Sequence, residues 1–313
     1  MRRAFKYRLW TNATQGRELA AALETHRRLY NACLEQRKTA YATAKRSVQY
    51  TEQSAWFKAE RRVNPYFADL NFSSAQATMR RLDKAFVNFF RRVQQGSGKP
   101  GYPRFKGRDR FDSFTFPAYR DGVRLAGTRL YVQHVGKVRV KLHRPVEDTI
   151  KTVTLKREAG KWYAVFSCVL PDVPVADNGK PAAGIDVGLE AFLTTSDGER
   201  EPNPGYLKEA LPGLRRASRA VARKKKGGSN RRKAVRRLAK VHARVRNLRR
   251  EHHHQVALKL VRRYGFIAAE SLNVQGMLRN GRLSRAIADA GWAGFLLTLR
   301  GKAESAGVRF VES

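Results

Sequence analysis

The pattern of apolar and polar positions predicts that the chain opens with a strand and continues as helices. Residues 3–10 alternate basic with apolar side chains, as expected when one face of a strand meets a core and the other meets solvent or phosphate. Residues 15–46 carry apolar positions at helical spacing with arginine and lysine between them, and residues 73–93 form a second block of this kind. We expect Ser73 or Ser74 to cap the second block.

Glycine and proline end the helical pattern near residue 96, where the run GSGKPGYP cannot continue a helix. Two pairs of strand-like segments follow, and each pair flanks a glycine turn, so residues 124–132 and 153–170 are predicted to form hairpins. We expect the opening strand to join their sheet. The prediction is a β-barrel domain interrupted by an inserted helical lobe, covering residues 1–13 with 96–172 and residues 14–95 respectively.

A second domain is predicted after a linker at residues 173–181, which contains two prolines and lacks apolar periodicity. Beyond the linker, short apolar segments alternate with helical ones, which is typical of an α/β domain over residues 182–313. Two basic helices between residues 207 and 263, separated by a glycine turn, are expected to pack as a helical hairpin. The other expected elements are strands at 182–187, 189–195, 266–272 and 308–311, and a helix at 292–306.

Charge is the strongest property of the composition. Lys and Arg number 64 against 26 Asp and Glu, which leaves a net charge of +38 at pH 7. Self-repulsion at that charge opposes compaction unless a polyanion neutralises it, so we expect a nucleic-acid partner.

The first 30 residues lack the apolar run of a signal peptide, and no stretch approaches the ~20 apolar residues of a membrane span. A cytoplasmic protein without a membrane partner is therefore predicted.

Two acids in apolar segments are candidates for metal binding. Asp186 lies in one expected strand and Glu270 in another. Burying an unpaired carboxylate is costly, so each needs a cation, a hydrogen-bond network or solvent at the strand's edge. Acids on neighbouring strands can share Mg²⁺, which prefers oxygen ligands. The alternatives are that Asp186 caps a turn and that Glu270 pairs with a nearby arginine.

Two basic clusters are candidates for nucleic-acid binding. One is interleaved with phenylalanines after residue 103, and the other flanks the glycine turn at residues 227–228. Phosphate contact with base stacking would use both residue types, whereas a solvated helix tip and aromatic core packing are the alternatives. The predicted nucleic-acid-binding residues are Arg104, Lys106, Arg108, Lys224, Lys225, Lys226, Arg231, Arg232 and Lys233.

Five segments resemble motifs of the TnpB family, the RNA-guided endonucleases of insertion-sequence transposons that are often described as transposases. GIDVGL at 184–189 and AESLNVQGM at 269–277 are similar to the first two motifs of its RuvC-like domain. The remaining three are FKYRL at 5–9 with Gln15, HRRLYN at 26–31 and PRFK at 103–106 with Ser113 and Phe114. The resemblance covers essentially the whole chain.

The resemblance implies a fold, a set of partners and a metal. It implies that residues 182–313 are an RNase H-like (RuvC) domain carrying the basic helical hairpin, with Asp186 and Glu270 as two of three catalytic, metal-binding carboxylates for Mg²⁺ or Mn²⁺. It also implies a guide RNA and a double-stranded target DNA as partners, and association with the nucleoid when DNA is bound.

The family's zinc ribbon has no counterpart in the sequence, since Cys33 and Cys168 form no CxxC pair. The family's third acid has no counterpart either. We therefore expect a C-terminally truncated RuvC domain without zinc, which binds guide RNA and target DNA but has lost cleavage. Two alternatives remain open: an active metal-dependent DNA endonuclease, or a non-functional transposon relic.

Overall fold

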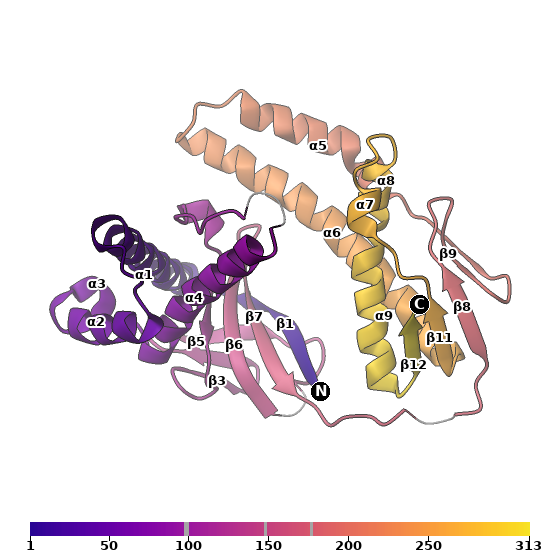
Figure 1. Ribbon diagram of the computed structural model, residues 1–313, viewed down its shortest axis with the longest axis horizontal. Helices are drawn as coiled ribbons and strands as arrows, with labels where there is room; N and C mark the ends of the chain where they lie inside the picture. Colours follow the sequence, from indigo (N-terminus) through magenta and orange to yellow (C-terminus); the bar gives the residue numbers. More distant parts are fainter. Residues whose placement is uncertain (97–99, 147–148, 176–177) are drawn as a thin grey trace. The chain divides into compact units, whose positions relative to one another are not determined.

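The computed structural model describes residues 1–96, 100–146, 149–175 and 178–313, which divide into two compact units, Met1–Leu170 and Pro171–Ser313 (Figure 1). Parts of the predicted glycine-rich run and of the predicted linker lie outside the described residues. No helix in the described ranges is long and apolar enough to cross a bilayer.

The first unit is built on a seven-stranded antiparallel sheet with the strand order β2-β6-β7-β1-β5-β4-β3. The opening strand β1 (Arg2–Trp10) lies between β7 and β5, so the prediction that it joins this sheet is confirmed. Both predicted hairpins, β3 with β4 and β6 with β7, are present. The remaining strands are β2 (Ser113–Phe116), β3 (Val123–Ala126), β4 (Arg129–Val132), β5 (Gly136–Lys141), β6 (Thr149–Glu158) and β7 (Lys161–Val169).

The first unit has four helices, and the two long ones, which Asn12 and Asn71 start, pack against the sheet. The Asn12 side chain accepts the Gln15 backbone N–H at 2.8 Å, and Asn71 accepts that of Ser74 at 2.9 Å. The expected cap at Ser73 or Ser74 was wrong, because the asparagine begins the helix earlier. The helices are α1 (Ala13–Ala44), α2 (Tyr50–Val63), α3 (Pro65–Ala68) and α4 (Phe72–Gln94), and a short 3₁₀ helix, η1 (Arg108–Arg110), precedes β2.

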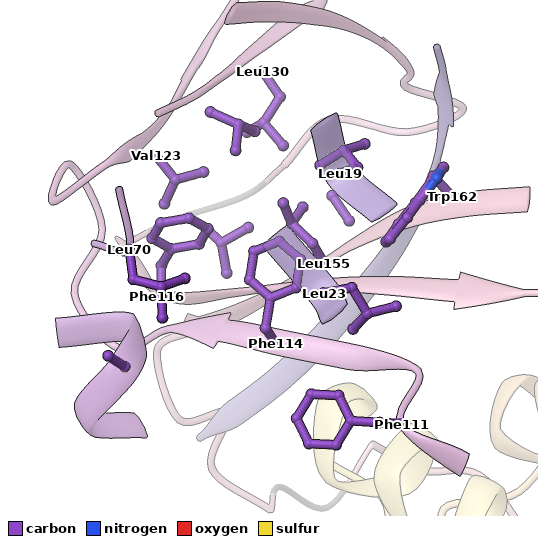
Figure 2. Packing of buried hydrophobic residues seen from close by; sticks show 14 of the residues in the cluster. Leu19, Leu23, Leu70, Phe111, Phe114, Phe116, Val123, Leu130, Leu155 and Trp162 are labelled. Carbon is purple, nitrogen blue, oxygen red and sulfur yellow. The ribbon is translucent and has the colours of Figure 1, made fainter. Parts of the chain in front are cut away.

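The predicted barrel is an open, curled sheet. Its edge strands β2 and β3 are not hydrogen-bonded to each other in the described part of the chain. Helices close the core instead: Leu19 and Leu23 of α1 join Phe114, Leu130 and Leu155 of the strands in one buried cluster, and these side chains converge on one interior (Figure 2). Burying the inner face under helices removes the apolar surface that would otherwise favour closing the strands on themselves.

The second unit contains a five-stranded mixed sheet with the order β10-β9-β8-β11-β12. The three strands β8, β11 and β12 run parallel, whereas β9 and β10 are antiparallel to their neighbours. The third of the predicted strands is shorter than expected, because β11 ends at Ala269. The strands are β8 (Ala182–Asp186), β9 (Ala191–Thr195), β10 (Arg200–Pro202), β11 (Phe266–Ala269) and β12 (Arg309–Glu312).

Two long helices of the second unit, α5 (Tyr206–Ala222) and α6 (Ser229–Arg263), pack against each other as a hairpin. Their seam is only partly buried, since Ala234 and Val245 are buried but Leu248 is 40% exposed. The C-terminal half of α6 packs with α9 in the core of this unit. The other helices are α7 (Val274–Met277), α8 (Ser284–Ala290) and α9 (Trp292–Ala306), the last with the predicted bounds.

Candidate metal and nucleic-acid sites

Asp186 and Glu270 stand at the carboxyl ends of two adjacent parallel strands. Asp186 is the last residue of β8, and Glu270 follows the last residue of β11. Ile185 pairs with Ala269 in the register of these strands, so Asp186 and Glu270 share the next row. Because neighbouring strands in a sheet lie about 4.8 Å apart, the two carboxylates begin one strand spacing from each other.

The row continues onto the third parallel strand. The Ser313 N–H donates to the Ala269 carbonyl at 3.0 Å, and the Ser313 carbonyl accepts the Ser271 N–H at 2.8 Å. These two bonds form a parallel bridge that places Ser313 opposite Glu270. On β8, β11 and β12 the row therefore holds two carboxylates and one hydroxyl, and on the other side of Asp186 it continues through Thr194 to Arg200.

The three acids that follow Glu270 in the sequence lie away from this row. Glu312 pairs with Ala269 in the preceding row, and its carboxylate contacts Arg300 of α9 at 2.9 Å. Asp289 accepts the Leu207 N–H at the start of α5 and pairs with Arg249 at 2.9 Å. Glu304 is exposed on α9. Among the described residues no group of three or more His, Cys, Asp or Glu could hold a metal ion.

Both candidate metal ligands are exposed at the ends of their strands rather than in the middle of them, so solvent at the strand's edge is the possibility that the structure bears out. Solvent at the strand ends hydrates the carboxylates, so neither requires a cation to offset burial. Their oxygen atoms are nevertheless the donor type that Mg²⁺ and Mn²⁺ prefer. The donor set fits such an ion with two carboxylates, while Cys33 and Cys168 are buried as free thiols.

The tip of the α5–α6 hairpin carries six of the predicted nucleic-acid-binding residues. Five of their side chains are exposed and that of Arg231 is half-buried, and within the described chain none of the six has an ion-pair partner. The whole stretch from Tyr206 to Arg250 contains 18 Lys and Arg and one acid, Glu209. A groove between the two helices has a floor of small residues such as Ala217 and Ala234 and a rim that includes Lys224 and Lys233.

Two of the sequence motifs contact each other in the first unit. The Arg27 and Asn31 side chains donate to the Lys106 carbonyl at 2.8 and 3.1 Å, and Asn31 accepts the Lys106 N–H at 2.8 Å. The Lys106 ammonium lies 5.7 Å from the centre of the Tyr30 ring. Positions 27, 30 and 31 share one face of α1 because they are three and four residues apart. The motif at 26–31 therefore holds the motif at 103–106 in place.

The neighbouring cations of this segment differ in their surroundings. Arg104 is exposed, whereas Arg108 lies 3.7 Å from Glu24, a carboxylate that also contacts Arg27 and Arg28. The Arg27 hydrogen bonds lower the pKa of Glu24 to about 2. Among the phenylalanines, Phe105 is 43% exposed, but Phe111, Phe114 and Phe116 are buried, so core packing explains those three.

Comparisons with known proteins identify the family. A family model described as a probable transposase matches residues 165–281, and one described as a helix-turn-helix domain matches residues 1–46. A protein of Streptomyces pristinaespiralis named putative RNA-guided DNA endonuclease is 34% identical over 305 residues, which cover 93% of this chain and 72% of that protein. The chain belongs to the TnpB family. The resemblance seen in the sequence motifs is thereby confirmed.

Other TnpB-family and structural relatives are more distant. The protein InsQ of Escherichia coli K12, also named a putative RNA-guided DNA endonuclease, is 27% identical and covers 92% of this chain and 74% of its own length. A solved Cas12f1 complex with guide RNA and target DNA aligns with a TM-score of 0.35 at 11% identity, covering 100% of this chain and 85% of that one.

The segment that matches the helix-turn-helix model, residues 1–46, forms one strand and one long helix in this structure rather than two helices joined by a turn.

Sequence reasoning missed two features of these sites. It did not find Ser313 as the third member of the acidic row, because strand pairing at the end of β12 has no local signal. It also did not assign Arg27 and Asn31 to the support of Lys106, although their helical spacing is visible in the sequence.

Proposed function

We propose that residues 1–313 bind a guide RNA and, through base pairing of that RNA, a double-stranded DNA target. The observation that carries this proposal is the α5–α6 hairpin, with 18 Lys and Arg and a single acid between Tyr206 and Arg250. Cations at this density gain free energy by replacing counterions condensed on phosphates. The relatives' names as RNA-guided DNA endonucleases supply the class of partner.

In the same proposal the second unit is the RuvC-like domain, and Asp186 and Glu270 bind Mg²⁺ or Mn²⁺. At adjacent strand ends, these two carboxylates would be the residues that hold such a cation. A bound divalent cation polarises phosphate and lowers the pKa of water, and the paired-cation form of this chemistry needs carboxylates that fix both ions. The row provides two carboxylates, so we propose that this chain binds its target far better than it cleaves it.

The binding half of the proposal is tested by what the purified protein carries and by its salt response. We expect RNA to co-purify with the protein. For a structured RNA, we expect the logarithm of the binding constant to fall linearly with the logarithm of the salt concentration. Neutralising Arg231, Arg232 and Lys233 to Gln should reduce the salt slope by about 0.7–0.9 per residue. A protein that purifies free of RNA and binds RNA with no salt dependence would contradict the proposal.

The cleavage half is tested with guide RNA, target duplex and Mg²⁺ or Mn²⁺, using the full-length Streptomyces relative as the comparison. We expect cutting by the relative and binding without cutting by residues 1–313. Guide-dependent cutting by residues 1–313 that disappears in Asp186→Ala would show that another residue completes the site. The proposed loss of cleavage would then be wrong, while the proposed binding would stand.

A further inference from the structure

The outer face of the seven-stranded sheet, opposite the helices, carries unpaired cations in cross-strand register. In β1, β3, β4 and β5 the core-facing positions such as Leu9, Leu130 and Val140 are buried. These four strands contain nine Lys and Arg and no acid. We call their outward-facing surface the cationic sheet face, and its main residues are Arg8, Trp10, Arg129, Lys137, Arg139 and Lys141.

Like charges stand directly opposite one another on the cationic sheet face. Arg8 pairs with Lys141 across β1 and β5, and Arg129 pairs with Arg139 across β4 and β5. Opposed residues in antiparallel strands have Cβ atoms about 4.5–5.5 Å apart, and like charges at that separation are destabilising. Within the ranges that the structure describes, none of these four side chains has an ion-pair partner. The free protein therefore carries a repulsion that an anionic partner would relieve.

Two alternative explanations fit less well. General solvation of surface cations does not explain why other cations of the same sheet are paired, Lys6 with Glu158 at 2.6 Å and Lys156 with Asp112 at 3.5 Å. Protection of a sheet edge against aggregation places lysine on edge strands. The opposed cations here lie on β1, β4 and β5, which are all interior strands of the sheet.

Trp10 adds an aromatic surface to these cations. It pairs with Arg139 across β1 and β5, so the row reads Arg129, Arg139 and Trp10 across three strands. Its side chain is 54% exposed, whereas Trp162 is 6% and Trp292 3% exposed. The Arg8 guanidinium lies 5.3 Å from the centre of the Trp10 ring. An exposed indole between arginines offers stacking to a base and charge to its phosphate.

We propose that the cationic sheet face binds a single-stranded segment of RNA, with a base stacked on Trp10 and the adjacent phosphates on Arg129 and Arg139. A duplex keeps its bases stacked inside and offers no free base to the indole, so the exposed ring favours an unpaired strand. The choice of RNA rests on the proposed function. The cross-strand repulsion exists whenever the protein is folded. In the proposed function the guide RNA is bound before any target DNA, so the guide is the strand that would relieve this repulsion.

Intrinsic fluorescence of the full chain tests the proposal, since the chain has four tryptophans and Trp10 is more exposed than Trp162 and Trp292. The probe is an unstructured oligouridylate of about 12 nucleotides, within the range of single-stranded site sizes. We expect it to quench the emission of the wild type. Trp10→Phe should lose most of this quenching, and Trp56→Phe should keep it. Trp10→Ala should weaken binding about tenfold, as expected for loss of one stacked base.

Charge variants provide the matched control. Arg139→Gln should lower the salt slope of oligouridylate binding by about 0.7, whereas Lys156→Gln, which removes a paired cation from the same sheet, should leave it unchanged. Arg139→Gln should also raise the melting temperature of the RNA-free protein at low salt, which confirms folding and reports the relieved repulsion.

The possible results separate this inference from the proposed function. Binding of structured RNA through the hairpin without quenching of Trp10 would overturn the sheet-face proposal alone. Equal or tighter binding of an oligothymidylate or of an RNA duplex, with the same Trp10 response, would overturn the assignment to single-stranded RNA. Absence of any RNA binding by the wild type would overturn the proposed function as well.

Discussion

Asp186 and Glu270 occupy one row of the mixed sheet, each one residue beyond the paired Ile185 and Ala269. Two exposed carboxylates that begin a strand spacing apart repel each other when both are ionised. A divalent cation held between them would convert this repulsion into attraction, whereas Arg200, the arginine of the same row, stands two strands away from Asp186. The arrangement is therefore suited to hold one cation weakly.

The first prediction concerns this cation. Mn²⁺ should bind the chain, and Asp186→Asn or Glu270→Gln should each weaken that binding about tenfold or more, because each removes one of two charged ligands. Electron paramagnetic resonance of free Mn²⁺ measures the affinity directly. Glu312→Gln is the matched control, since that carboxylate pairs with Arg300 in the preceding row and should not affect Mn²⁺. Equal losses for all three variants would show that the ion follows general negative charge.

The second prediction concerns the hairpin tip. Replacing Lys224, Lys225 and Lys226 by Gln should reduce affinity for structured RNA and for DNA duplexes alike, because phosphate contacts carry no sequence information. The melting temperature should change little, since within the described ranges these lysines have no ion-pair partner. Filter binding over a salt series measures the effect. A change in affinity that is independent of salt would argue against phosphate contact.

The sequence predicted local structure well because its signals were local. Alternation in residues 3–10, the two glycine turns and the spacing of apolar residues in 292–306 each depend on neighbours along the chain. The Ala159–Gly160 turn has φ values of 49° and 79°, which a type I′ hairpin requires and which glycine favours.

Long-range features were harder to predict. Whether the curled sheet closes depends on how far α1 and α4 cover its inner face, and no single segment encodes that balance. The exposure of Asp186 and Glu270 depends on where β8 and β11 end relative to each other. Apolar neighbours in the sequence indicated burial, but a strand that ends one residue earlier places the acid in solvent.

The third prediction separates contact residues from support residues around the motif at 103–106. Arg104→Gln with Lys106→Gln should weaken nucleic-acid binding and change the free energy of unfolding by less than about 0.5 kcal/mol, as for surface side chains. Asn31→Ala should instead destabilise the protein by about 1–3 kcal/mol, because it removes two of the three side-chain hydrogen bonds to the Lys106 backbone and leaves only that of Arg27. Chemical denaturation and RNA binding, measured on both variants, would show whether the two roles are distinct.

The fourth prediction concerns acid sensitivity. Burial lowers the pKa of His26 to about 3 and that of His253 to about 4, from an ordinary value of 6.5. The unfolded chain therefore binds protons first as pH falls, so the free energy of unfolding is fully present above pH 6.5 and decreases below it. The limit is about 1.4 kcal/mol per pH unit for each histidine.

Urea denaturation between pH 7 and pH 5 measures this slope before most carboxylates titrate. His26→Gln should remove one histidine's share of the slope, while His242→Gln, on the exposed face of α6, should leave it intact. A wild-type free energy of unfolding that is constant over this range would contradict the prediction.

The fifth prediction concerns the polar network inside the helical part of the first unit. The Arg37 guanidinium donates to Gln53 at 3.0 Å and to Asp83 at 2.9 Å, and it lies 4.9 Å from the Phe86 ring. Gln53 is 1% exposed and donates to the Cys33 carbonyl at 2.7 Å, so the network joins α1, α2 and α4. Arg37→Ala should leave the Gln53 side-chain oxygen without its donor and remove a buried stem.

The expected cost of Arg37→Ala is about 2–4 kcal/mol, from an unsatisfied buried acceptor together with lost packing. Arg37→Met keeps most of the stem and should cost less, which separates packing from hydrogen bonding. Lys38→Ala, one position along the same helix and exposed, is the control and should stay within about 0.5 kcal/mol of the wild type.

Because Asp83 is 39% exposed, water can replace its arginine partner, so Asp83→Ala should cost less than Arg37→Ala. The reverse order in thermal or urea unfolding would mean that the ion pair, rather than the Gln53 contact, stabilises this part of the fold.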